Sequence, residues 1–180
     1  MLNVLVWELG GRRVGDALWG RRPRPIPGPD ESTVGRWNLA SPAELTAHRM
    51  QLSAALDSAR PDGADDGAVE RLLLAFEELA SNALRHGRPP VRVAVTTTGT
   101  WWLLEVSDAA VDLPPIPAVG RDAALGGLGL YLVADICATH GWDADDQSKV
   151  AWCQIDYTRA EAPPEGPPSI PEPRSADGGW

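Results

Sequence analysis

The stretch EELASNALRHG, from Glu77 to Gly87, constrains the fold of this chain more than any other part of the sequence. Apolar residues recur in it and just before it at three- and four-residue steps, the pattern of a helix with one buried face. They are Leu72, Leu73, Phe76, Leu79, Ala80 and Ala83. Gly87 follows them, and glycine is common just past a helix end. The pattern predicts a helix over residues 67–86 that packs on a hydrophobic core.

The same helix carries a polar stripe made of Glu78, Asn82 and His86. Residues four apart lie one above the other on a helix surface, so these three side chains line up. A carboxylate, a carboxamide and an imidazole in a row suit a face that meets a metal ion and phosphate groups. A polar face turned to solvent has the same spacing, so the spacing alone leaves both interpretations open.

Length and charge limit the classes of partner. The chain has 180 residues, enough for about one domain with a real core, and a formal net charge of −9. That charge disfavours direct binding to a nucleic-acid backbone, although a local positive site can still hold a small nucleotide. No apolar run approaches the length of about 18 residues that predicts a membrane span. The two cysteines, Cys137 and Cys153, form no CxxC motif, and we expect a reducing, cytoplasmic environment.

Composition divides the chain into three parts. Residues 1–40 are an N-terminal extension with a basic, proline-bearing tract, RRPRPIPGPDES, which predicts an extended linker. The opening LNVLVWEL fits either a short strand or a peptide that docks elsewhere. Residues 41–158 are expected to carry the fold. Residues 159–180 are rich in Pro, Glu and Gly, which predicts a disordered tail.

Helix and turn signals in residues 41–158 predict an α+β fold. Ser41-Pro42-Ala43-Glu44 is typical of a helix start, and this helix is expected to end near Ala59. Alternating residues at 91–98 and 101–108, with Gly99 between them, predict a hairpin. A last strand is expected over 150–157. The pattern predicts helices on one face of a mixed, mainly antiparallel sheet.

A third helix is expected over residues 127–142, with an apolar inner face. The residues expected to face inward are Leu128, Leu132, Val133 and Ile136. The glycines of the preceding GGLGL let backbone N–H groups approach an anion, and a helix N-terminus adds a favourable dipole. GGLGL lacks the third glycine of GxGxxG, so it matches the dinucleotide fingerprint poorly.

In this order, EELASNALRHG, EVSDAA and GGLGLYLV resemble the motifs of the GHKL ATPase superfamily, whose ATP-binding domain is the Bergerat fold. That superfamily joins gyrase, heat-shock chaperone ATPases, histidine kinases and mismatch-repair ATPases. The compact length and the Glu-x-x-x-Asn-Ala-x-x-His-Gly spacing are most similar to the anti-sigma-factor serine kinases of bacteria. The resemblance covers about residues 41–158 and implies a two-layer α/β sandwich of the Bergerat type.

The resemblance also implies roles for the matching residues. Asn82 matches the asparagine that holds Mg²⁺ against the ATP phosphates, and Glu78 matches the general base. Asp108 matches the aspartate that accepts a hydrogen bond from the adenine amino group. Gly127 and Gly129 match the second glycine box, whose amides hold the phosphates. The expected cofactors are therefore ATP and Mg²⁺.

The chain departs from the family pattern after the aspartate, where Ala109 and Ala110 stand in place of the glycines of DxGxG. Alanine does not take positive φ cheaply, so we expect the turn beside the base to differ. Arg121 is the only cation of the lid between Asp112 and Leu125. It is expected either to stabilise charge at the terminal phosphate or to face solvent.

Two functional hypotheses follow from the resemblance. In the first, the protein is a serine/threonine kinase that transfers the ATP γ-phosphoryl to a serine of an anti-anti-sigma-type partner and so regulates transcription. In the second, it is a non-catalytic ATP-binding switch that sequesters a sigma factor or another regulator. The retained Glu78 favours the first, and the altered aspartate box favours the second. An acidic interaction domain without a nucleotide is a third, weaker option, and homodimer formation stays open.

Overall fold

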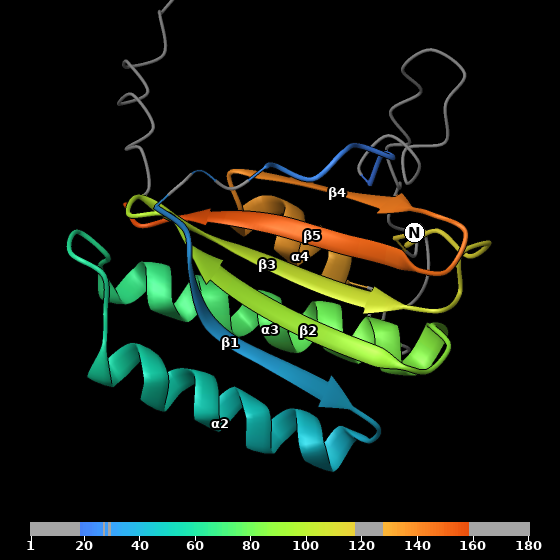
Figure 1. Cartoon of the computed structure of the whole chain (residues 1–180), viewed down its shortest axis with the longest axis horizontal. Helices are drawn as coiled ribbons and strands as arrows, with labels where there is room; N and C mark the ends of the chain where they lie inside the picture. The colour runs from blue at the N-terminus through green and yellow to red at the C-terminus, as the bar shows by residue number, and fades with distance from the viewer. Residues whose placement is uncertain (1–18, 27, 29, 118–127, 159–180) are drawn as a thin grey trace, which may run out of the picture.

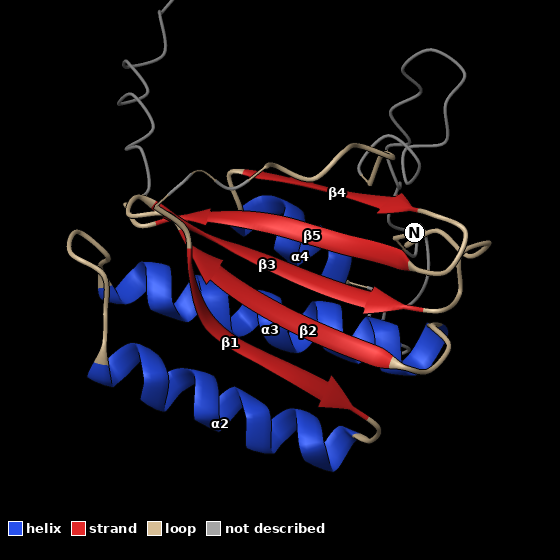
Figure 2. Cartoon of the chain, viewed as in Figure 1, coloured by secondary structure: helices blue, strands red, loops and turns tan. Residues whose placement is uncertain are grey.

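A computed structural model describes residues 19–26, 28, 30–117 and 128–158 of the chain. Its centre is a five-stranded sheet in the order β1-β2-β3-β5-β4, and every neighbouring pair of these strands is antiparallel. Figures 1 and 2 show the helices on one face of this sheet. The predicted α+β architecture with two layers is confirmed. The strands are β1 (Ser32–Leu39), β2 (Val91–Thr97), β3 (Trp101–Asp108), β4 (Thr139–Ala144) and β5 (Lys149–Asp156).

Local capping explains where the first two helices begin. Helix α2 (Pro42–Ser58) starts after Ser41, whose hydroxyl accepts a hydrogen bond from the Glu44 amide. The Glu44 carboxylate bonds back as predicted, but it accepts from the amide of Ala40 at 2.8 Å, one residue before the N-cap, so the pair is a shifted form of the capping box. Helix α3 (Asp66–His86) is capped by Asp65, which accepts from the amide of Ala68. The third helix is α4 (Gly129–Ile136).

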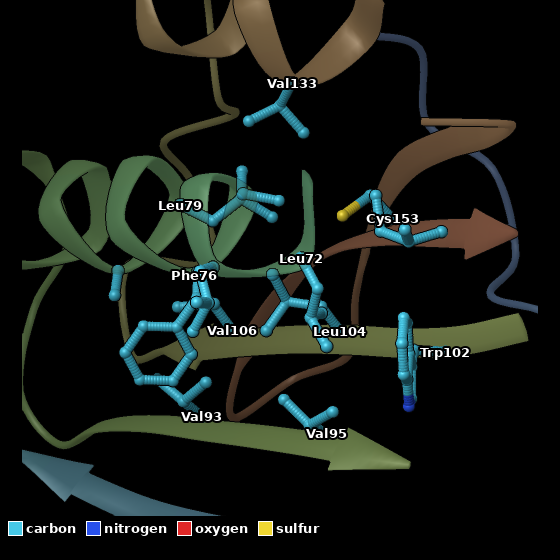
Figure 3. Close-up of a cluster of buried hydrophobic side chains, with 14 of the residues drawn as sticks. Leu72, Phe76, Leu79, Val93, Val95, Trp102, Leu104, Val106, Val133 and Cys153 are labelled. Atoms are coloured by element: carbon cyan, nitrogen blue, oxygen red, sulfur yellow. The ribbon is translucent and has the colours of Figure 1, made fainter. Parts of the chain in front are cut away.

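The core lies between α3 and the inner face of the sheet (Figure 3). All the residues of the predicted apolar face of α3 are buried. Alternate residues of the strands meet them from below, because successive side chains of a strand point to opposite faces. Those labelled in Figure 3 are Val93, Val95, Trp102, Leu104, Val106 and Cys153. Burial of this apolar surface is the main favourable term that holds α3 in place.

An N-terminal strap, residues 19–26, wraps the β4 edge of the sheet (Figure 1). The Trp19 ring is 2% exposed, and its Nε1 donates to the carbonyl oxygen of Leu130 in α4 at 2.8 Å. The backbone of Arg22 donates to the Trp142 carbonyl oxygen of β4 at 2.8 Å. Beyond that point Arg24 forms an ion pair with Glu105 of β3. The strap therefore satisfies part of an otherwise open sheet edge.

Two sequence expectations need correction. The predicted boundary at residue 40 leaves out Ser32–Leu39, which is edge strand β1, and Trp19, which is part of the core. The third helix ends at Ile136 instead of continuing to residue 142, because residues 139–144 pair with β5 as β4. With the helix this short, Val133 is buried, whereas Leu128 and Leu132 are exposed. Helical periodicity could not reveal a strand pairing made by distant residues.

The expected tail, residues 159–180, lies outside the described residues. No helix in the described part of the chain has the length and apolar character needed to cross a membrane.

Candidate functional site

Glu78 and Asn82, the first two residues of the polar stripe, lie one helical turn apart on α3. Both are half-buried. Neither side chain makes a hydrogen bond or ion pair within the described part of the chain, so a carboxylate and a carboxamide are available to a ligand there. The third residue of the stripe, His86, is exposed at the helix end. The structure therefore separates the stripe into two sheltered polar groups and one solvated group.

The first turn of α4 lies directly against Glu78. A Cβ atom built on Gly129 would come within 2.0 Å of Glu78 Oε2, so only glycine fits without moving that carboxylate. The N-cap residue, Leu128, makes no side-chain capping bond to the first turn. The N-terminal amides of a helix carry partial positive charge and attract anions. The predicted glycine-lined helix start thus adjoins the predicted general base.

Asp108 ends β3 beneath the C-terminal end of α3 and is 3% exposed. Its Oδ1 accepts hydrogen bonds from the backbone N–H of Ala110 at 2.8 Å and of Arg88 at 3.4 Å. A Cβ atom on Gly87 would lie 2.6 Å from Asp108 Cγ and 2.5 Å from the Ala83 carbonyl oxygen. Gly87 has φ −86°, so the position requires glycine for space and not for a left-handed backbone. Gly87 therefore closes α3 and also lets Asp108 approach it.

Lys149, the first residue of β5, is a member of this site that the sequence reasoning missed. It lies directly opposite Asp108 in the antiparallel register, and both residues point to the helix side of the sheet. Its Nζ is 3.2 Å from Asp108 Oδ2 and donates to the Leu113 carbonyl oxygen at 2.7 Å. A sequence signal did exist: Lys149 is the only lysine in a chain whose other cationic side chains are arginines.

The turn after Asp108 accommodates the two alanines without strain. No non-glycine residue among those described has positive φ, so Ala109 and Ala110 adopt ordinary backbone conformations. Hydrogen bonds fix the turn: Ala109 donates to the Arg88 carbonyl oxygen at 2.8 Å, and Leu113 donates to that of Ala110 at 3.1 Å. The expected difference from the glycine-containing pattern is therefore a turn that uses only negative φ.

One ion pair joins this turn to the end of α3. Arg88 Nη1 lies 2.8 Å from Asp112 Oδ1, and both side chains are more than half exposed. A backbone hydrogen bond at Asp112 and the Arg88 guanidinium lower the pKa of this carboxyl. Gly127 and Arg121, the remaining predicted site residues, lie outside the described residues.

These groups are ordered along α3. Glu78 and Gly129 meet past the middle of the helix, Asn82 follows one turn later, and Asp108, Lys149 and Gly87 meet at its C-terminal end. At a rise of 1.5 Å per residue, the nine steps from Glu78 to Gly87 span about 13.5 Å. This arrangement suits an elongated ligand that has anionic groups at one end and a hydrogen-bonding ring at the other.

The donor set also fits a hard cation shared with such a ligand. No group of three His, Cys, Asp or Glu side chains that could hold a metal ion occurs within residues 19–26, 28, 30–117 and 128–158. Mg²⁺ commonly takes only one or two oxygen ligands from the protein and the rest from water and phosphate. The carboxamide oxygen of Asn82, which has no hydrogen-bond partner among the described residues and lies one turn from Glu78, matches that requirement.

Comparison with known proteins gives a family match. A model of the histidine kinase-like ATPase domain matches residues 39–154, well over half of the chain. Among curated proteins, no match was found. The solved structure of the Acinetobacter baumannii histidine kinase AdeS is 17% identical and covers 69% of this chain and 68% of that chain, with a TM-score of 0.38. A likeness this distant does not bear on the function.

Proposed function

The chain belongs to the histidine kinase-like ATPase family of the GHKL superfamily, and on this premise we propose that it binds ATP with Mg²⁺ and acts as a serine/threonine protein kinase. Its substrate is a serine of an anti-anti-sigma-type protein, and through this partner, or through a sigma factor, it regulates transcription. The observation that carries the proposal is the ordering of free or sheltered polar groups along α3, from Glu78 and Asn82 to Asp108.

Each side chain has a specific task in this proposal. Asp108 accepts a hydrogen bond from the adenine amino group, and Asn82 provides the protein oxygen for Mg²⁺. The amides at Gly127 and Gly129 hold phosphate oxygens, and Arg121 adds positive charge near the terminal phosphate. Bound Mg-ATP supplies the phosphoryl group that is transferred.

Glu78 is the catalytic residue for the proton transfer. Its carboxylate takes the proton from the serine hydroxyl as the oxygen attacks phosphorus, so the leaving group departs as ADP and the serine becomes a phosphate ester. The absence of any hydrogen-bond partner for this carboxylate within the described residues supports the assignment, because an already paired carboxylate is a weaker base. Gly129 preserves this free position by leaving room for Glu78 Oε2.

Thermal unfolding with and without nucleotide tests the binding step. A ligand that binds only the folded state at 100 times its Kd adds about 2.7 kcal/mol. For a chain of this size we expect Mg-ATP to raise Tm by about 5–10 °C. GTP should give a much smaller shift. Asn82→Ala should abolish the Mg²⁺-dependent part, and Ser81→Ala, on the same helix, should not. No shift with millimolar Mg-ATP would contradict the proposal.

The altered aspartate box favours one alternative function, that of a non-catalytic switch that binds ATP and sequesters a sigma factor or another regulator. The two functions differ in one measurement, namely the appearance of phosphoserine on the captured partner after incubation with Mg-ATP. A Tm shift without any phosphorylated partner would identify the switch.

A further inference from the structure

Among the described residues, the buried ion pair of Asp108 and Lys149 leaves one hydrogen-bond donor and one acceptor without a partner. Lys149 Nζ has three N–H groups, and two of them point to Asp108 Oδ2 and the Leu113 carbonyl oxygen. A carboxylate has about four acceptor positions, and Asp108 uses three of them, for Ala110, Arg88 and Lys149. Within the part of the chain that the structure describes, one N–H of Lys149 and one lone pair of Asp108 therefore remain available on adjacent groups.

Because this ion pair is buried, the presence of two charged residues here cannot be explained by surface solubility. The Lys149 and Asp108 side chains are 5% and 2% exposed. Removing two charges from water is costly, and a buried ion pair is seldom more stable than apolar residues of the same size. The pair also reaches the loop after β3, because Lys149 bonds the carbonyl oxygen of Leu113.

We propose that Lys149 is a second base-recognition residue, which donates a hydrogen bond to the ring nitrogen N1 of adenine while Asp108 accepts one from the adjacent 6-amino group. The inference rests on the proposed ATP site. It follows from the order of these two groups. Asp108 offers an acceptor and Lys149 offers a donor beside it, so the pair complements a base edge that presents a donor beside an acceptor. Adenine presents this edge through its amino group and N1.

The pair rejects guanine at both positions. In the same orientation, guanine places its O6 acceptor against the Asp108 carboxylate and its N1–H donor against the Lys149 ammonium. A site built to hydrogen-bond one group discriminates strongly against an analogue that leaves its buried polar groups unpaired. Asp108 alone would read one position of the base, whereas Asp108 and Lys149 together read two.

An adenine analogue tests the inference on the unmodified protein. We expect 1-deaza-ATP, which replaces N1 by a C–H group, to bind about tenfold more weakly than ATP in isothermal titration calorimetry, because a hydrogen bond to a charged donor is lost. Purine riboside triphosphate, which lacks the 6-amino group, should lose affinity through Asp108. Equal affinity of the wild-type protein for ATP and 1-deaza-ATP would overturn the inference.

A substitution completes the test. Lys149→Met should weaken ATP by a similar factor and make ATP and 1-deaza-ATP bind equally, while Arg88→Met, at an exposed neighbouring cation, should preserve the difference. If Lys149→Met does not fold, the analogue comparison on the wild-type protein still decides. A penalty for 1-deaza-ATP that persists in a folded Lys149→Met protein would also overturn the inference.

The single lysine provides a second readout without any substitution. Labelling with ¹⁵Nζ-lysine gives one lysine ammonium resonance, that of Lys149. We expect ATP to shift this resonance and saturating 1-deaza-ATP to leave it close to its unliganded position; equal shifts from the two would count against the proposed contact. Failure of ATP to bind at all would defeat the proposed function, whereas ATP binding with no role for N1 would defeat only this inference.

Discussion

At the residue scale, Glu78 and its neighbour Glu77 are chemically identical and structurally different. Glu78 is half-buried beside Gly129 and has no partner among the described residues. Glu77 is 53% exposed and forms an ion pair with Arg49 of α2 at 3.3 Å. Adjacent positions on a helix face different directions, so this pair supplies a matched comparison.

We predict that Glu78→Gln keeps Mg-ATP affinity within a few-fold and lowers the rate of phosphoryl transfer by about 10²–10⁴, the usual contribution of a general base. Glu77→Gln should change neither. The measurement is calorimetric Kd together with single-turnover transfer to the purified partner. Transfer at the wild-type rate in Glu78→Gln would show that this carboxylate is not the base.

The cysteines give a pH-dependent prediction at the same scale. Burial raises the pKa of Cys137 to about 12 and raises that of Cys153 well above its ordinary value. An unfolded thiol ionises near pH 8.5. Above that pH the thiols of the unfolded chain lose protons, while those of the folded protein stay protonated. The contribution of the two thiols to the free energy of unfolding is therefore complete below about pH 8.5 and declines as pH rises.

At pH 8 we therefore expect both thiols to react with Ellman's reagent much more slowly in the native protein than in guanidinium chloride, because the thiolate is the reactive form. The time course of absorbance measures this directly. A native thiol that reacts as fast as free cysteine would contradict the burial of that residue.

At the element scale, two glycines hold α3 against its neighbours for different reasons. A Cβ on Gly129 meets the end of the flexible Glu78 side chain, whereas a Cβ on Gly87 meets the α3 backbone and the buried Asp108 carboxyl. The first obstacle can rotate away, and the second cannot move without disturbing the core.

We predict that Gly87→Ala destabilises the protein by about 1–3 kcal/mol. Gly129→Ala should leave Tm nearly unchanged or raise it slightly, since alanine favours a helix, but it should displace Glu78 and reduce phosphoryl transfer. Gly67→Ala in the first turn of α3, where the nearest atoms are 3.4 Å away, is the control. Denaturant unfolding measures the stability of each variant, and transfer assays measure its activity. Equal effects of Gly87→Ala and Gly129→Ala on both quantities would contradict this account.

At the scale of the whole molecule, the N-terminal strap connects the sheet edge to the helix layer. Trp19 is buried against His140 of β4, with ring centroids 4.9 Å apart, and donates to the Leu130 carbonyl oxygen in the first turns of α4. The same turns carry Gly129. The strap is therefore part of the support of the candidate site.

We predict that Trp19→Ala lowers the free energy of unfolding by about 3–5 kcal/mol, the usual result of removing a buried aromatic side chain. Ile26→Ala, at the 91% exposed end of the same strap, should change it by less than about 0.5 kcal/mol. Chemical denaturation of both variants measures the difference. Equal stabilities would mean that the strap does not contribute to the core.

The sequence by itself determined the elements whose signals are local. The apolar spacing of α3, the capping box at Ser41 and the alternation around Gly99 gave helix, cap and hairpin within a few residues of their observed bounds. Such patterns depend on neighbours within one or two turns, and a single chain displays them completely. The stripe of Glu78 and Asn82 was found in the same way, whereas Asp108 was identified from the resemblance to a family motif, and the roles of all three stay predictions.

Only the tertiary structure decided which distant residues meet. Strand pairing places Lys149 opposite Asp108, turns residues 139–144 into β4 and brings β1 and Trp19 into a domain predicted to begin at residue 41. The reason is physical: register and edge pairing depend on how separate segments bury one common apolar surface, and no local pattern in either segment records its partner.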